Sequence, residues 1–173
     1  MALHVVFVEP EIPYNTGNLI RTCACTNTVF HVVHPIPFNL HDDKKARRAG
    51  LDYWDRASFT EHESLEEFLK IYGPEGTEPH RLFLATTKGK HKYTDFEYKD
   101  EDMFLFGKET AGLPKPFIKE HEETAIRIPM SESTVERSIN LSNSANIILY
   151  EALRQTGFIG LEEKGELHNL KYL

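Results

Sequence analysis

Short apolar runs of strand length alternate with helix-length patterns along most of this chain. The apolar runs cover Leu3–Val8, Val29–Val33, Arg81–Thr86, Met103–Phe106 and Thr124–Ile128. Four helical patterns lie between and after these runs. The first begins near Thr16, the second covers Ser64 to Tyr72, a short third one follows Pro114, and the longest extends from about Leu141 to Thr156. Strands that alternate with helices predict an α/β fold with a mostly parallel sheet flanked by helices.

Several residues mark where these elements begin and end. Ser64 and Glu67 have the spacing of a capping box, and Gly73-Pro74 ends the helix that they begin. Gly157 is a favourable C-terminal cap for the last and longest helix. Residues 88–102 are polar and rich in turn formers, so we expect a surface loop there.

The segment Pro10–Thr22 follows the first apolar run directly. Its two prolines interrupt regular structure, and Asn15 or Thr16 can then cap a helix that carries Gly17 in its first turn. Free N–H groups at a helix start attract anions, and Arg21 lies about one turn further along. The segment therefore suggests a phosphate-binding site, although an ordinary strand-to-helix loop would show the same local pattern.

Three later strand ends carry unusual chemistry, in the segments Leu84–Gly89, Leu105–Pro114 and Ile126–Asn143. None contains a G-x-G-x-x-G fingerprint, a phosphate loop or a G-x-S-x-G elbow. Their glycines, small side chains and apolar neighbours suit the enclosure of a flat adenine at the carboxyl edge of a parallel sheet. Glu109 is a carboxylate in one of these loops, and it is either part of that site or a solvent-exposed turn acid.

Composition limits the classes of partner. The chain has 173 residues and a formal net charge of −7, which suits one soluble domain and argues against binding nucleic acid by bulk attraction. A local basic cluster follows two acids, in the segment Asp42–Gly50, with cations at Lys44, Lys45, Arg47 and Arg48. This cluster is either a nucleic-acid contact or the solvated face of a short helix whose charges complement its dipole.

The cysteines and histidines do not predict a metal site. Cys23 and Cys25 are separated by one residue, which is not a zinc or redox spacing, so we expect two buried thiols. The nine histidines are scattered, without a ligand cluster of recognised spacing. The sequence also lacks an apolar stretch long enough to cross a membrane and a secretory signal, so we expect a cytoplasmic protein.

Taken together, the segments 10–22, 105–114 and 126–143 resemble the three motifs of the SpoU branch of the SPOUT RNA methyltransferases, and most closely the small YibK-like group. Further stretches that resemble this group are Glu9–Pro13, Asn15–Asn18 with Arg21, Arg47–Tyr53, Thr86–Gly89 and Tyr150–Gln155. The resemblance extends to about Gly157. It implies one domain over residues 1–157 and a separate tail over 158–173.

The resemblance implies an α/β fold with a deep C-terminal trefoil knot and a homodimer. The loops after Thr86, Gly107 and Ile128 would surround S-adenosylmethionine. The implied cofactor residues are Ala85, Thr86, Gly107, Glu109, Gly112, Ile128, Met130, Ser138 and Leu141. Relatives often hold leucine at the position of Ala85, which changes apolar contact but not the backbone groups that read adenine.

The implied activity is methylation of the ribose 2′-oxygen of the wobble nucleotide, cytidine or uridine, in a tRNA anticodon loop. S-adenosylhomocysteine would be the product, and no metal would be needed, because the sulfonium already activates the methyl group. The implied catalytic residues are Asn18, Arg21, Ser138 and Asn140, and the implied RNA-binding residues are Arg21, Lys45, Arg47 and Arg48.

Three alternatives stay open on the sequence. The first is a non-catalytic RNA-binding protein of the same fold, and the second is a methyltransferase for another tRNA or rRNA nucleotide. The third is a nucleotide-binding enzyme of ordinary doubly wound fold. The missing phosphate and dinucleotide motifs argue against the last of these.

Overall fold

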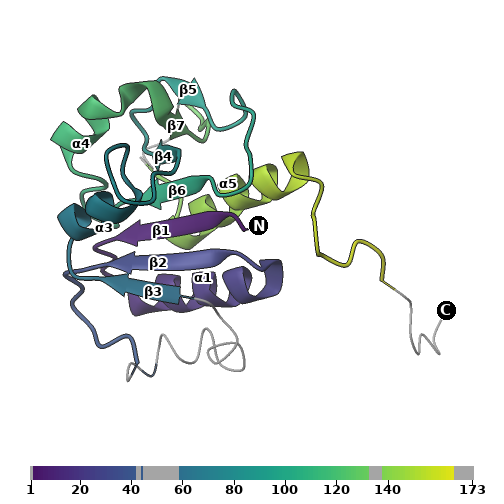
Figure 1. Cartoon of the computed structure of the whole chain (residues 1–173), viewed down its shortest axis with the longest axis horizontal. Helices are drawn as coiled ribbons and strands as arrows, with labels where there is room; N and C mark the ends of the chain where they lie inside the picture. The colour runs from purple at the N-terminus through teal and green to yellow at the C-terminus, as the bar shows by residue number, and fades with distance from the viewer. Residues whose placement is uncertain (1, 42–43, 45–58, 133–137, 166–173) are drawn as a thin grey trace.

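The computed structural model describes residues 2–41, 44, 59–132 and 138–165. Within them, seven strands form one sheet in the order β3-β2-β1-β6-β4-β7-β5, and every neighbouring pair is parallel (Figure 1). The strands are β1 (His4–Val8), β2 (Val29–Val33), β3 (Phe59–His62), β4 (Leu82–Ala85), β5 (His91–Lys92), β6 (Met103–Phe106) and β7 (Ala125–Arg127). The predicted α/β class with a mostly parallel sheet is confirmed.

Helices cover both faces of this sheet, in the way that central strands of continuous apolar character require. They are α1 (Pro13–Thr26), α3 (Leu65–Tyr72), α4 (Lys115–Glu120) and α5 (Leu141–Gln155), with a short 3-10 turn, η2 (Glu122–Thr124), before β7. Alternate residues of β1 point to opposite faces: Val5 and Phe7 pack with α1 and α5, whereas Val6 and Val8 pack with α3 and α4.

The predicted elements match the structure closely, with two kinds of difference. β3 and β5 were not predicted, because each is short and carries polar residues that give no apolar run. The prediction that Asn15 or Thr16 caps the first helix was wrong: α1 begins at Pro13, and both residues lie inside it. Proline is favoured in the first turn of a helix, and this preference decides the boundary. The trefoil knot stays a prediction.

The α3 boundary follows the capping-box prediction. The Ser64 hydroxyl accepts a hydrogen bond from the Glu67 amide at 3.1 Å, and the Glu67 carboxylate accepts one from the Glu63 amide at 2.6 Å. The helix ends at Tyr72, and the amide of the following Gly73 donates to the Leu69 carbonyl oxygen. Likewise α5 ends one residue before Thr156 and is followed by Gly157 at φ 74°.

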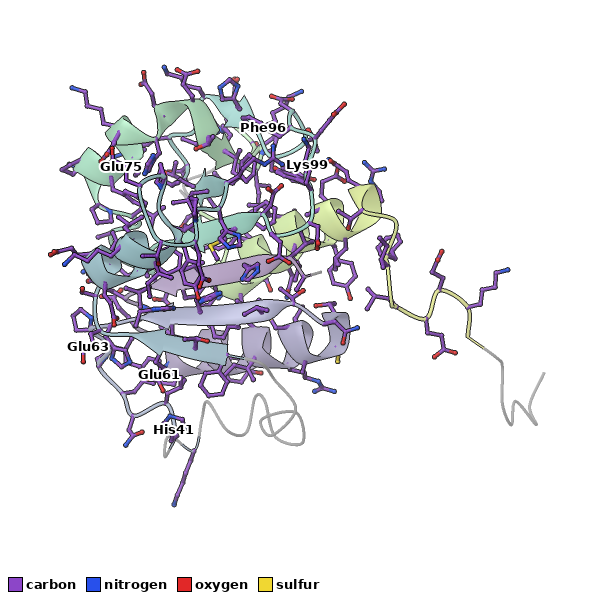
Figure 2. The ribbon with its side chains drawn as sticks, viewed as in Figure 1. His41, Glu61, Glu63, Glu75, Phe96 and Lys99 are labelled. Atoms are coloured by element: carbon purple, nitrogen blue, oxygen red, sulfur yellow. The ribbon has the colours of Figure 1, made fainter. Side chains whose placement is uncertain are left out.

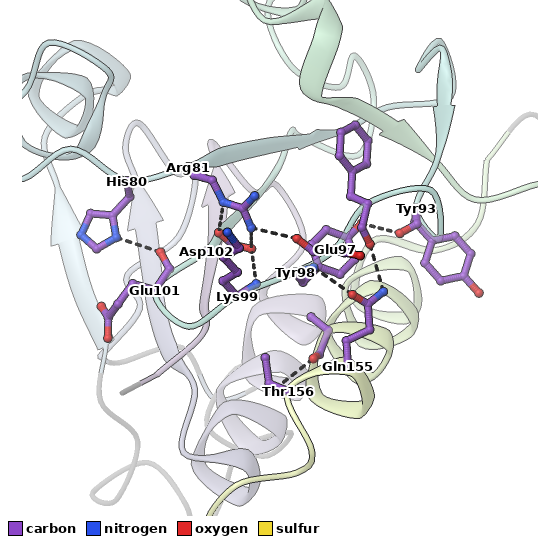
Figure 3. A network of polar contacts seen from close by, with 12 residues as sticks. His80, Arg81, Tyr93, Glu97, Tyr98, Lys99, Glu101, Asp102, Gln155 and Thr156 are labelled. Atoms are coloured by element: carbon purple, nitrogen blue, oxygen red, sulfur yellow. Dashed lines mark hydrogen bonds and ion pairs between the residues drawn. The ribbon is translucent and has the colours of Figure 1, made fainter.

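Residues 88–102, which were predicted to form a surface loop, contain the short strand β5 and are otherwise held by side-chain hydrogen bonds (Figure 3). Gln155 at the end of α5 accepts a hydrogen bond from the Tyr98 amide at 2.8 Å and donates one to the Phe96 carbonyl oxygen at 3.1 Å. Arg81 grips Asp102 through two hydrogen bonds of 2.7 and 2.6 Å. The Arg81–Asp102 contacts hold the residue that directly precedes β6 against the residue that directly precedes β4.

The expectation of two buried thiols is half wrong, since Cys23 is buried and Cys25 is exposed. Two residues spaced by two on a helix point in nearly opposite directions, so only one of them can face the core. None of the helices in the described part of the chain is both long and apolar enough to span a membrane.

Candidate active site at the carboxyl ends of the strands

A cavity of about 450 Å³ opens at the carboxyl ends of three neighbouring strands, β6, β4 and β7. Its walls come from the loop after β4, the loop after β6, the chain after β7 and the segment that leads into α5. All nine predicted cofactor residues line it, and so does Asn140. Ile12 and Asn15 at the start of α1 line it as well, so segments as far apart in sequence as Asn15 and Leu141 meet at one site at the carboxyl edge of the parallel sheet.

Glu109 ties the loop after β6 to the start of α1. Its carboxylate accepts hydrogen bonds from the Glu11 amide at 2.7 Å, the Ile12 amide at 3.2 Å and the Asn15 side-chain amide at 2.7 Å. A negative charge at a helix N-terminus also interacts favourably with the helix dipole. Glu109 is therefore a structural anchor of the site and not a solvent-exposed turn acid.

Two further contacts join the same pair of loops from the opposite direction. The Glu11 carboxylate accepts hydrogen bonds from the amide and the hydroxyl of Thr110, each at 3.0 Å. These bonds hold the pKa of Glu11 below its usual range. Lys108 pairs with Glu9 at 2.8 Å, which raises the pKa of the lysine. The two loops are thus joined by reciprocal acid contacts.

An amide relay carries this connection to the third wall of the cavity. Asn15 donates to Glu109 and accepts a hydrogen bond of 3.0 Å from the Asn140 side-chain amide. The Asn140 oxygen in turn caps α5, accepting from the Asn143 amide at 3.2 Å and from the Ser142 hydroxyl at 2.9 Å. One continuous set of hydrogen bonds thus connects α1, the Glu109 loop and α5.

Two glycines allow backbone segments to approach each other closely at the cavity. A Cβ on Gly107 would lie 2.0 Å from the carbonyl carbon of Gly112, which itself has φ 70°. A Cβ on Gly89 would lie 2.6 Å from the carbonyl carbon of Ile126. Neither position accepts a side chain without moving backbone.

The amino-acid sequence matches the SpoU rRNA methylase family over residues 2–150. The chain belongs to the SpoU methylase family. It is 45% identical to the tRNA (cytidine(34)-2'-O)-methyltransferase of Escherichia coli (strain K12), with 91% of this chain and 96% of the relative covered.

Two solved structures resemble this SpoU methylase. One, described as giving structural insights into the 2-OH methylation of C/U34 on tRNA, has a TM-score of 0.81 and 35% identity, and 90% of this chain and 96% of that chain are covered. The other is the SpoU methyltransferase AviRb from Streptomyces viridochromogenes in complex with AdoMet, with a TM-score of 0.77, 26% identity and coverage of 93% and 59%. The predicted family and its methyltransferase class are confirmed, and S-adenosylmethionine is the cofactor that these findings support.

The predicted catalytic residues of this SpoU methylase are not all gathered in the cavity. Ser138 and Asn140 line it, whereas Asn18 and Arg21 are not among its lining residues. Arg21 is exposed, six residues beyond Asn15 on α1, which corresponds to a rise of about 9 Å. Lys45, Arg47 and Arg48 lie outside the described residues.

Asn15 is the site residue that sequence reasoning missed. The sequence presented it as a local helix cap, and only the fold reveals that its side chain links Glu109 to Asn140. The sequence carries no signal for these partners, because they lie 94 and 125 residues away from Asn15.

Proposed function

We propose that this SpoU methylase transfers a methyl group from S-adenosylmethionine to the ribose 2′-oxygen of nucleotide 34 in tRNA. The observation that carries the proposal is the convergence of three family motifs on one cavity, joined by the Glu109–Asn15–Asn140 relay. The relatives described above carry the nucleotide assignment, since their names specify position 34 of tRNA.

The cavity residues fit the proposed cofactor. Its volume lies within the range of about 300–1,000 Å³ that small-molecule sites occupy. Ile128, Met130 and Leu141 supply apolar surface for an adenine, and the glycine walls leave backbone groups accessible to it. When bound, S-adenosylmethionine supplies a methyl group that its sulfonium charge already activates.

The reaction is an in-line displacement: the O–C bond forms as the C–S bond breaks, and the 2′-hydroxyl loses its proton. We assign Arg21 to the RNA side, where its guanidinium grips the phosphate next to the reacting ribose. A group with a pKa above ~12 is a poor proton acceptor, so the proton passes to that phosphate or to a water. Asn18 supports the same side, and Ser138 and Asn140 orient the ribose or the cofactor.

The experiment compares Arg21→Lys with the wild type and with a control, Arg154→Lys, at a surface arginine paired with Glu151. We expect Arg21→Lys to lower methyl transfer by about two or more orders of magnitude, because the lysine lacks the planar fork. S-adenosylhomocysteine should still raise the unfolding temperature of both variants. Near-normal turnover in Arg21→Lys would remove this residue from the chemistry.

The same assay separates the alternatives. A non-catalytic RNA-binding protein would bind tRNA without transferring a labelled methyl group, and a nucleotide-binding enzyme would be stabilised by NAD or ATP instead of S-adenosylhomocysteine. Mapping of ribose methylation in tRNA from a strain lacking the protein identifies the nucleotide. Methylation missing at a position other than 34 would redirect the substrate assignment.

We further propose that the enzyme is a homodimer formed through α1 and α5. The large exposed apolar side chains of these helices and of the residue that precedes α1 are Ile12, Tyr14, Ile147 and Tyr150. Such surface on two packed helices is typical of an interface. Arg21 lies on α1 and is not among the residues that line the cavity of its own chain. We therefore propose that, in a dimer formed through α1, this arginine acts at the cavity of the second subunit. Tyr14→Glu with Tyr150→Glu should yield monomers in sedimentation, and an unchanged dimer would refute this surface.

The basic cluster is the proposed contact for the anticodon stem-loop. Alanine at Lys45, Arg47 and Arg48 should weaken tRNA binding and flatten its dependence on salt, since each lost phosphate contact lowers the slope by about one unit. An unchanged slope would return the cluster to an ordinary solvated surface.

A further inference from the structure

Three potential metal ligands converge at the end of the sheet opposite the cavity. His4 begins β1, His80 lies two residues before β4, and Glu101 lies two residues before β6. These strands are neighbours in the order β1-β6-β4, so the three residues meet at their amino ends. One ligand atom from each residue lies within 4.8 Å of the other two.

The remaining polar atoms of these side chains already have partners. His80 Nδ1 donates to the Glu101 carbonyl oxygen at 2.8 Å (Figure 3), so its Nε2 carries the lone pair that a metal requires. The Ala2 amide donates to Glu101 Oε1 at 3.2 Å, whereas His4 Nε2 and Glu101 Oε2, which contact each other at 3.0 Å, are the candidate ligand atoms of these two residues. Hydrogen bonds of this kind orient ligands in metal sites.

A row of buried histidines extends from His4 across the sheet. His4 Nδ1 contacts His31 Nε2 at 2.9 Å, and His31 Nδ1 contacts His62 Nε2 at 3.0 Å. All three residues are buried. Because the Glu101 carboxylate only accepts, a neutral His4 donates from Nε2, and His31 and His62 must then also carry their protons on Nε2. The metal-free protein therefore has one consistent set of tautomers.

A rigid contact holds the ligands in place. Arg81 and Asp102, the residues that directly follow His80 and Glu101, form the two-point ion pair described above, and the Asp102 side chain is 2% exposed. A bidentate arginine pair fixes orientation as well as distance. The Glu101 side chain is 46% exposed, which gives an ion access from solvent.

We propose that His4, His80 and Glu101 bind one divalent transition-metal ion, with Zn²⁺ as the best chemical match and a water as the remaining ligand. Two imidazoles and a carboxylate are a donor set that zinc accepts. This departs from the expectation drawn from histidine spacing, because the three ligands are far apart in sequence. The ion would tie together the amino ends of three central strands and would take no part in methyl transfer.

Binding at His4 Nε2 has a consequence for the whole row. That nitrogen gives up its proton, so Nδ1 must become the donor toward His31. His31 then donates from Nδ1 to His62, and His62 takes up a proton at Nδ1. One proton leaves at His4 and one enters at His62, so all three rings remain neutral and all three tautomers reverse.

The test is equilibrium dialysis of the full, untagged chain against Zn²⁺, with metal analysis of the protein. The variants are His80→Gln and Glu101→Gln, and the matched control is His41→Gln. His41 contacts Glu61 at 2.8 Å in a second histidine–carboxylate contact that lies apart from the proposed site (Figure 2). We expect one ion per chain in the wild type and the control, and at least tenfold weaker binding in both ligand variants. Equal binding in all four proteins, or none tighter than about 1 mM in the wild type, would overturn the proposal.

A second measurement does not depend on the folding of any variant. Nitrogen-15 NMR of the histidine rings in wild-type protein distinguishes the Nδ1-H and Nε2-H tautomers. Addition of Zn²⁺ should convert His4, His31 and His62 from Nε2-H to Nδ1-H, whereas adventitious surface binding would leave the buried His31 unchanged. An unchanged His31 at saturating Zn²⁺ would refute the assignment.

Discussion

Glu109 offers the sharpest test of how the site is held together. Replacement of Glu109 by glutamine keeps the shape of the side chain but exchanges one acceptor oxygen for a donating amide. In the wild type the Glu11 N–H donates a hydrogen bond of 2.7 Å to Oε2 of Glu109. If the remaining oxygen of the glutamine keeps its bonds to Ile12 and Asn15, the new NH₂ group faces that N–H. A donor would thus meet a donor.

The expected loss follows from these contacts. A hydrogen bond to a charged acceptor contributes about 1.5–3 kcal/mol to stability, and the charge–dipole interaction at a helix start adds about 0.3–1 kcal/mol. Because the Ile12 contact is solvent-exposed and the other two are only partly buried, we expect the lower end, about 2 kcal/mol. With a urea m-value of about 2 kcal/mol per molar, the unfolding midpoint should fall by about 1 M.

The assay is urea unfolding of the wild type, Glu109→Gln and Glu11→Gln. Glu11 joins the same two loops, but its bonds to Thr110 are exposed to solvent, so its substitution should cost clearly less. S-adenosylhomocysteine should also stabilise Glu109→Gln less than the wild type, because the cavity wall has lost its anchor. A midpoint shift for Glu109→Gln no larger than that for Glu11→Gln would refute the reasoning.

Three further predictions concern single positions. Gly107→Ala should abolish S-adenosylhomocysteine binding in calorimetry, because its Cβ would lie 2.0 Å from Gly112 backbone, and retained affinity would contradict the close approach. Asn140→Ala should lower the free energy of unfolding by about 1 kcal/mol through loss of the α5 cap, measurable by urea titration, whereas no loss would contradict the capping role. Burial, with His4 and His62 nearby, lowers the pKa of His31 to about 3. Stability in chelator-treated protein should therefore be complete above pH ~6.5 and should fall below it, by about 2 kcal/mol at pH 5, while His31→Leu should show a shallower pH dependence.

The sequence predicted those parts of the fold that depend on local signals. Apolar runs located five of the seven strands described, and Ser64 and Gly157 marked helix ends correctly. β3 was missed because Phe59–His62 pairs with β2 through its backbone, which needs no apolar run. Local pattern also misplaced the start of α1, which Pro13 sets. It gave no sign of the carboxylate that satisfies the amides there, because that group belongs to Glu109, 98 residues beyond Glu11.

The site was predictable where glycine-rich strand ends matched a known family, and all nine residues derived that way line one cavity. Their roles as cofactor ligands remain a proposal. The histidine row was not predictable, because it depends on the register between strands. His4 pairs with Val29 and His31 pairs with Val6, so the rings meet on a diagonal that spacing along the chain does not reveal.

The anchoring of α1 by Glu109 has a consequence for synthesis on the ribosome. The amide of Glu11 leaves the ribosome 98 residues before the carboxylate that receives its hydrogen. At about 5–20 residues per second, this separation amounts to a wait of roughly 5–20 s. Throughout that interval the nascent amino-terminal motif lacks the acid that completes it, so the cavity at the carboxyl ends of the strands can form only late in translation.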